Sequence, residues 1–188
     1  MRTPGLILAF CVTFAAGTSA RQEAIPTTLH GSLAGIFELS QQEFLAVAEA
    51  MPEDKYGFIP KDGAFEDARS FGEQVRHVAC ANVGFFNEIE GKAPPEACER
   101  EPKDVKTKAQ LVAYLKDAFS YGNRVLATVD AGTALQRADG RYGGPNTKLG
   151  IASIAIWHLA DHYGQLVVYL RMNAIVPPPT KQYGVKAR

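Results

Sequence analysis

Apolar residues recur at spacings of three and four over four long segments of this chain, and this periodicity predicts four amphipathic helices. Two of the segments open with a capping box, at Ser70–Glu73 and at Thr107–Gln110. No stretch alternates for long with the period of two that marks a half-buried strand. The sequence therefore predicts an all-α fold, a four-helix bundle whose helices cover about residues 32–51, 70–91, 107–132 and 147–173.

Three long connections, rich in glycine, proline or aspartate, separate these segments: residues 52–69, 94–106 and 139–146. The last helical segment is apolar nearly all round at its start, which favours a central position in the bundle. Pro177, Pro178 and Pro179 end the helical region. We place the bundle domain at residues 32–180 and a C-terminal tail at residues 181–188.

The first 20 residues have the features of a secretory signal peptide. Arg2 precedes an apolar stretch over residues 6–16, and Thr18-Ser19-Ala20 supplies a small-x-small cleavage pattern. The apolar stretch is shorter than the roughly 20 residues that a membrane-spanning helix needs. An uncleaved anchor or a buried helix is the alternative. We predict cleavage after Ala20, a short N-terminal extension over residues 21–31, and an exported protein, periplasmic or secreted.

Cleavage at that point would leave Cys80 and Cys98 as the two cysteines of the mature chain. Cysteines usually pair in an oxidising compartment, so we expect a disulfide between them. Cys80 falls opposite the apolar stripe of its predicted helix, which favours an outward side chain that reaches Cys98 in the following connection. The alternative is that Cys80 is a metal ligand.

The overall charge narrows the range of partners. Twenty basic and 20 acidic residues give a formal net charge of zero. Without a basic stripe we expect no nucleic-acid partner, and without a second long apolar stretch we expect no membrane contact after signal cleavage. A small-molecule ligand or substrate is the partner that we expect. A homodimer formed through exposed helix faces is compatible with this fold.

Histidine spacing is the strongest chemical signal. His158 and His162 are separated by four residues, so they share one face of the last predicted helix at a Cβ separation of about 5–6 Å. His77 on the second predicted helix is the natural third ligand, because facing helices of a bundle build metal sites. Three imidazoles with one position left for water are typical of catalytic rather than structural metal sites. His30 precedes the first predicted helix and has no evident partner in the sequence.

The same histidines allow other interpretations. Leu159 stands where a zincin has glutamate, so H-E-x-x-H chemistry is excluded, but Asp161 leaves an inverted-motif metallopeptidase open. A carrier of metal or small ligands without turnover, and a structural bundle with unmetallated histidines, are the non-enzymatic alternatives. Asp161 and Gln165 are weak candidates for catalytic helpers, Asp161 as a hydrogen-bond partner of a ligand imidazole and Gln165 as a partner of bound substrate.

Two stretches carry a resemblance to the DinB/YfiT-like superfamily of metal-dependent enzymes. The first is Ser70-Phe71-Gly72-Glu73-Gln74-Val75-Arg76-His77, and the second runs from His158-Leu159-Ala160-Asp161-His162 to Ile175-Val176-Pro177-Pro178. The resemblance implies a four-helix bundle with His77, His158 and His162 as ligands of one divalent metal ion, most often zinc or nickel. It implies a hydrolase or a transferase. Some members transfer low-molecular-weight thiols, but the expected export argues against thiol transfer here.

Overall fold

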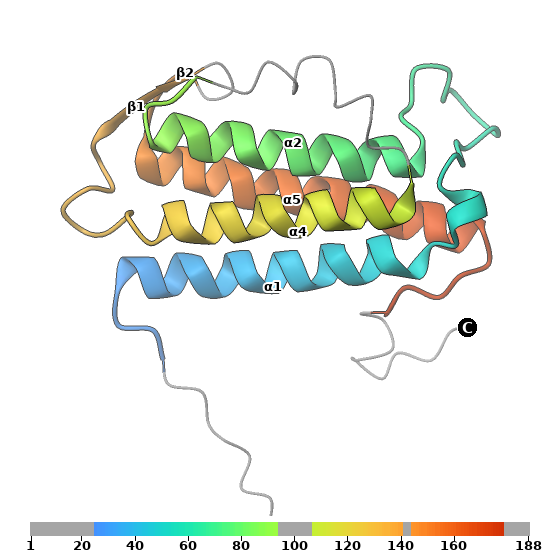
Figure 1. Cartoon of the computed structure of the whole chain (residues 1–188), viewed down its shortest axis with the longest axis horizontal. Helices are drawn as coiled ribbons and strands as arrows, with labels where there is room; N and C mark the ends of the chain where they lie inside the picture. The colour runs from blue at the N-terminus through green and yellow to red at the C-terminus, as the bar shows by residue number, and fades with distance from the viewer. Residues whose placement is uncertain (1–24, 94–106, 141–143, 179–188) are drawn as a thin grey trace, which may run out of the picture.

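A computed structural model describes residues 25–93, 107–140 and 144–178 of the 188-residue chain. The predicted signal peptide, Cys98 and the predicted tail lie outside these ranges. Four long helices dominate the described part, which confirms the predicted helical bundle (Figure 1). The elements are α1 (Leu29–Ala50), the short 3-10 helix η1 (Glu53–Lys55), α2 (Phe71–Ile89), α4 (Lys108–Leu126), β1 (Arg137–Gly140), β2 (Gly144–Thr147) and α5 (Lys148–Met172).

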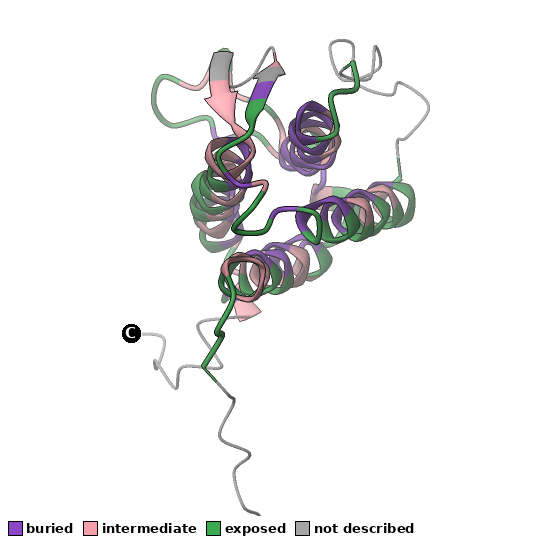
Figure 2. Cartoon of the chain, turned by 90° about the vertical axis from the view of Figure 1, so that its left-hand side faces the viewer, coloured by how far each residue is buried: buried purple, intermediate pink, exposed green. Residues whose placement is uncertain are grey.

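The four helices pack as a ring around one core. α2 packs against both α4 and α5, and α1 packs against the same two helices from the other side. Figure 2 views the bundle from one end, and the buried residues line the faces that the helices turn toward each other. In the middle of the core, Phe37 packs on Phe86 with ring centroids 5.3 Å apart, and on Phe119 at 6.4 Å. Aromatic pairs of this kind contribute about 0.5–1.5 kcal/mol each beyond the burial of their area.

Each of the four long helices begins at a serine or threonine that caps it. Both predicted capping boxes are present, with the side chains of Ser70 and Thr107 accepting from the third residue of their helices. α1 begins three residues earlier than predicted, because Thr28 accepts a hydrogen bond from the backbone N–H of Gly31 and starts the helix before its apolar pattern does. α4 ends at Leu126 rather than at Gly132, and turns follow it.

The prediction that the chain contains no sheet is wrong. β1 and β2 pair antiparallel, with Arg137 opposite Thr147 and Gly140 opposite Gly144. Each strand has four residues, which is too short for a period of two to stand out from a glycine-rich connection. The hairpin lies against the C-terminal end of α2, where Gly140 contacts the buried side chain of Glu88. The hairpin connects α4 to α5 along the chain and lies at one end of the bundle (Figure 1).

α5 is less central than its composition predicts, because one of its faces is open to solvent. Trp157 is 64% exposed on that face, and Val168 is also exposed. α2 is the more buried helix, because most of its residues are buried whereas only a minority of those of α5 are. Whether the exposed face of α5 mediates pairing into a homodimer stays a prediction.

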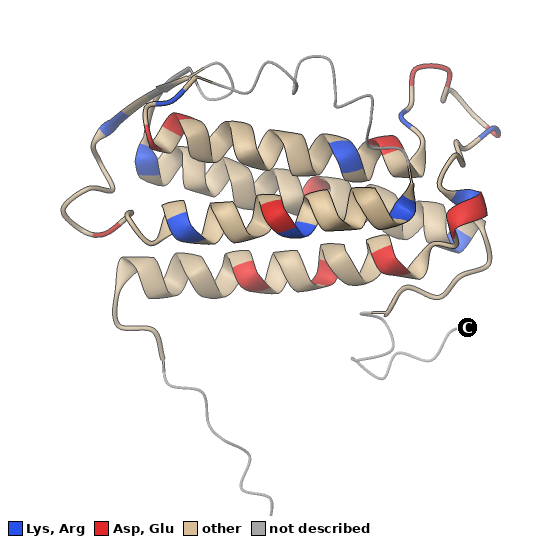
Figure 3. Ribbon diagram, viewed as in Figure 1, with Lys and Arg blue, Asp and Glu red and all other residues tan. Residues whose placement is uncertain are grey.

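Charged side chains are spread over the bundle. Lysine and arginine are absent from α1, which carries only acidic charges (Figure 3). These are Glu38, Glu43 and Glu49, and Glu49 forms an ion pair with Lys116 of α4 at 2.8 Å. Lysine and arginine are distributed over several other elements. Among the described residues, none of the helices is both long enough and apolar enough to cross a bilayer.

The contact between Gly140 and Glu88 predicts a stability difference between two glycine-to-alanine substitutions. A Cβ atom at Gly140 would overlap the buried Glu88 side chain, so Gly140→Ala is expected to lower the free energy of unfolding by about 1–3 kcal/mol. At Gly35 in α1 an added Cβ atom would have no neighbouring heavy atom within 4 Å, so Gly35→Ala is expected to raise the free energy of unfolding by about 0.5–1 kcal/mol. Urea unfolding of both variants measures the difference. A Gly140→Ala protein as stable as wild type would contradict the described packing.

Candidate metal centre

The three candidate histidines come together where α2 packs against α5. His158 and His162 project from adjacent turns of α5 with ring centroids 4.5 Å apart. The ring of His77, from α2, lies 5.1 Å from that of His158 and 4.9 Å from that of His162. The two helices run antiparallel, because Gln74 faces His162 whereas Phe85, further along α2, faces His158. This pairing brings together side chains that are 81 residues apart in the sequence.

The spacing of the ring nitrogens suits a single divalent ion. One ligand atom from each histidine lies within 4.8 Å of the other two, and Nε2 of His77 is 3.2 Å from Nε2 of His158. Two nitrogens bound tetrahedrally to one zinc ion, each at about 2.0–2.1 Å, are about 3.3–3.4 Å apart. His162 is buried, whereas His77 and His158 are half-buried. The group therefore lies at the edge of the core and can hold a metal ion.

All three histidines fall inside the part of the chain that matches a known family. Residues 36–166, well over half of the sequence, match the family model of the DinB superfamily. The chain belongs to the DinB superfamily. The resemblance seen in the two histidine-bearing stretches is thereby confirmed. No functionally curated protein matches the chain.

Solved structures with the DinB-like fold are similar to this one. A DinB-like protein, YjoA, from Bacillus subtilis has 20% sequence identity and a TM-score of 0.60, over 76% of this chain and 92% of its own. A DinB-like protein from Bacillus cereus has 14% identity and a TM-score of 0.64, over 80% of this chain and 96% of its own. At these identities the likeness shows the fold alone.

Burial keeps the imidazoles of this DinB-superfamily protein neutral. The pKa of His77 is lowered to about 4 and that of His158 to about 3, chiefly by burial and to a smaller extent by the positive charge of Arg69 and by neighbouring imidazoles. Burial also lowers the pKa of His162, against the opposing effect of Asp161. A neutral imidazole has a free lone pair on one nitrogen. At neutral pH the site is therefore ready to bind a cation without first releasing protons.

Two neighbours hold the rings in place. The Phe85 ring packs edge-on against His158, with centroids 5.4 Å apart. Oε1 of Gln74 is 2.9 Å from Nδ1 of His162, and Gln74 is 2% exposed. Gln74 is not among the site residues predicted from the sequence. A signal was available, because a glutamine falls within the apolar stripe of α2, between Phe71 and Val75, where a buried amide needs a polar partner.

The two weak helper candidates lie beside the histidines but contact each other. Nε2 of Gln165 donates to Oδ2 of Asp161 at 3.1 Å, and both side chains are exposed. Asp161 acts on His162 through its charge. The predicted hydrogen bond, in which a ligand imidazole would donate to the Asp161 carboxylate, is not formed in the described part of the chain, where His162 contacts Gln74 instead. A catalytic role for Asp161 or Gln165 stays a prediction.

The remaining candidates fall outside the histidine group. Cys80, predicted to point outward, is only 2% exposed. This burial was not predictable from the apolar stripe of α2, because the stripe indicates only which side of the helix faces the bundle core. Among the described residues, the group whose ligand atoms converge does not include Cys80. Its disulfide with Cys98 stays a prediction, since Cys98 lies outside the described residues. His30 lies in the first turn of α1, with Nδ1 3.3 Å from the carbonyl oxygen of Leu126.

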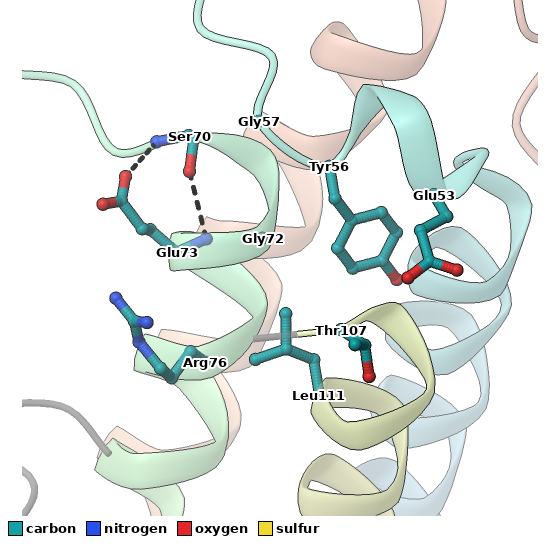
Figure 4. A pocket seen from close by; sticks show the side chains of 9 residues that line it. All are labelled: Glu53, Tyr56, Gly57, Ser70, Gly72, Glu73, Arg76, Thr107 and Leu111. Atoms are coloured by element: carbon teal, nitrogen blue, oxygen red, sulfur yellow. Dashed lines mark hydrogen bonds between the residues drawn. The ribbon is translucent and has the colours of Figure 1, made fainter. Parts of the chain in front are cut away.

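A separate pocket of about 410 Å³ lies near the N-terminal ends of α2 and α4 (Figure 4). Its polar groups are largely committed to the fold. Oε2 of Glu73 accepts from the Ser70 backbone at 2.8 Å, and the Tyr56 hydroxyl donates to the carbonyl of Ala48 at 2.6 Å. None of the three histidines lines it; the lining residues are Glu53, Tyr56, Gly57, Ser70, Gly72, Glu73, Arg76, Thr107 and Leu111.

The lowered histidine pKa values predict that the metal-free protein loses stability in mild acid. Below the ordinary histidine pKa of 6.5 the unfolded chain takes up protons at His77 and His158, whereas the folded chain does not until about pH 4 and about pH 3. The free energy of unfolding should therefore fall by about 1–2 kcal/mol between about pH 7 and pH 5.5, with partial exposure taken into account.

Urea unfolding of metal-free protein at both pH values measures this loss. A double variant, His77→Gln with His158→Gln, removes both imidazoles and should reduce the dependence of the free energy of unfolding on pH. A wild-type protein that gained stability as the pH fell over this range would contradict the buried, neutral state of the two rings.

Proposed function

We propose that this DinB-superfamily chain is a metal-dependent enzyme, a hydrolase or a transferase acting on a small-molecule substrate. His77, His158 and His162 would hold one divalent ion, zinc or nickel. The observation that carries the proposal is the convergence of three imidazole nitrogens, from two helices, within 4.8 Å of one another. Burial that favours their neutral, ligating form supports it.

The ligand set favours catalysis over a purely structural role. His77, His158 and His162 would hold the ion with fewer protein ligands than a closed structural site has, so a bound ion would supply Lewis-acid chemistry toward a substrate oxygen or a water molecule. The chain's own part is to supply three uncharged ligands, to hold them with Phe85 and Gln74, and to limit water at the core edge. Uncharged ligands leave the ion its full positive charge, which suits a Lewis acid.

One observation favours a second candidate, a metal- or ligand-carrying bundle without turnover. Hydrolysis at such a site usually uses a general base within hydrogen-bond reach of the reacting water. Among the described residues, the convergent group contains no carboxylate, and Asp161 forms its hydrogen bond with Gln165. That pairing also disfavours the inverted-motif metallopeptidase, which requires an acid aimed at the ion.

We also propose that the protein works outside the cytoplasm, as the signal-peptide pattern of residues 1–20 implies. Expression of the full chain in a bacterial host should yield a mature protein whose first residue is Arg21. N-terminal sequencing of the protein from the periplasm or medium measures this. A full-length chain, beginning at Met1 and retained in the cytoplasm, would exclude export.

The metal site predicts that untagged protein binds one zinc or nickel ion per chain. His77→Ala, His158→Ala and His162→Ala each remove one ligand, so each should weaken binding by more than the roughly 10–100-fold that loss of an outer partner costs. His30→Ala is the matched control, because His30 contacts Leu126 and is not part of the convergent group. Metal analysis and competition with a chromogenic chelator give the occupancy and the affinity. Equal affinity in His77→Ala and wild type would remove His77 from the site.

Activity assays on the metal-loaded protein distinguish an enzyme from a carrier. An enzyme should turn over an ester, amide or lactone, or form a thiol adduct, and should lose this activity on chelation and regain it with metal. The three ligand variants should lose the same activity, and His30→Ala should retain it. Tight metal binding without turnover of any substrate class would favour the carrier.

A further inference from the structure

The proposed function uses Gln74 only to hold a ligand ring in place, and its contact with that ring determines more than this. Gln74 lies on α2 one turn before His77, and its side chain is almost wholly buried, at 2% exposure. Its Oε1 atom faces Nδ1 of His162 on α5 at 2.9 Å. One helix therefore supplies both a metal-ligand candidate and a hydrogen-bond partner for a ligand on the opposite helix.

The chemistry of this contact determines which nitrogen of His162 carries hydrogen. An amide oxygen only accepts hydrogen bonds, so Nδ1 must be the protonated nitrogen of the ring. In a neutral imidazole the other nitrogen then has the free lone pair. Nε2 of His162 is thus the atom left to bind an ion, which matches His77 and His158, whose Nε2 atoms approach one another at 3.2 Å.

We propose that Gln74 is a positioning residue that fixes His162 as the Nδ1–H tautomer and presents its Nε2 to the metal. The metal half of this inference rests on the proposed function. A metal-ligating histidine usually donates its second N–H to an acceptor that orients the ring, and this acceptor tunes the affinity. Here the acceptor is a neutral amide rather than a carboxylate, so it orients His162 without adding negative charge beside the ion.

The first experiment measures the tautomer in metal-free protein. Long-range ¹H–¹⁵N NMR spectra distinguish a protonated from an unprotonated ring nitrogen. In wild type at neutral pH, His162 should show a protonated Nδ1 and an unprotonated Nε2. Gln74→Leu, which cannot accept a hydrogen bond, should shift the ring to a mixture or to the Nε2–H form. Gln74→Glu retains an acceptor and should keep the wild-type tautomer.

The second experiment measures zinc affinity in the same proteins by chelator competition. Gln74→Leu should bind zinc about 10–100-fold more weakly than wild type. Gln74→Glu should bind at least as tightly as wild type, because a carboxylate accepts the same hydrogen bond and adds a favourable charge. This rescue distinguishes positioning from a general loss of structure, which both substitutions would share.

Gln41→Leu is the matched control. Gln41 in α1 is also a buried glutamine, 7% exposed, but its Nε2 donates to Oδ1 of Asn123 in α4 at 3.1 Å. The same substitution there should alter stability while leaving the His162 tautomer and the zinc affinity unchanged. Urea unfolding of every variant confirms that the folded state is the one being measured.

The outcomes separate this inference from the proposed function. An unchanged tautomer in Gln74→Leu, or a wild-type His162 protonated at Nε2, overturns the role of Gln74 even if zinc binds tightly. A wild-type protein that binds neither zinc nor nickel overturns the proposed function. The tautomer signals, which need no metal, then still decide whether Gln74 orients His162.

Discussion

The antiparallel packing of α2 against α5 is the contact on which the candidate site depends. His162 faces Gln74, and His158 faces both His77 and Phe85, so the two helices meet in one register along this face. A helix rises about 5.4 Å per turn, so a slip of one turn would separate the three ring nitrogens beyond the reach of one ion. The hydroxyl of Tyr169 extends the same register by donating to the carbonyl oxygen of Arg69 at 3.1 Å.

This packing places polar rings at the edge of a largely apolar core, and such placement has a thermodynamic cost. Desolvation disfavours the protonated imidazoles, so the rings remain neutral, and neutral rings still need hydrogen-bond partners or a ligand. Gln74 satisfies one nitrogen of His162, while Phe85 shields His158. The surrounding core, with Phe37, Phe86 and Phe119 at its centre, compensates for this cost and holds the helices that carry the rings.

Most of the fold and the identities of the three histidines could be predicted from local signals. Apolar periodicity located the helices, and the capping boxes at Ser70 and Thr107 marked two helix starts, because both signals act within a few residues. Local signals alone could not predict that His77 converges on the other two histidines. That prediction also used the pairing of helices in a bundle and the resemblance to a known family. The start of α1 was missed because Thr28 caps it ahead of its apolar pattern.

What the sequence did not reveal depends on contacts between distant segments. The hairpin is too short to produce a pattern of its own, and its position follows from Gly140 meeting Glu88. Burial of Cys80 cannot be read from the stripe of one helix. The role of Gln74 depends on a partner 88 residues away.

The exposed face of α5 has a practical consequence. Trp157 is the only tryptophan of the chain, it is 64% exposed, and it directly precedes His158 on the same helical turn. Its indole emission therefore comes from a single place in the molecule, immediately beside the histidines. Intrinsic fluorescence can thus report on events at this turn, such as quenching by a paramagnetic ion or screening by an arriving ligand, without an attached dye.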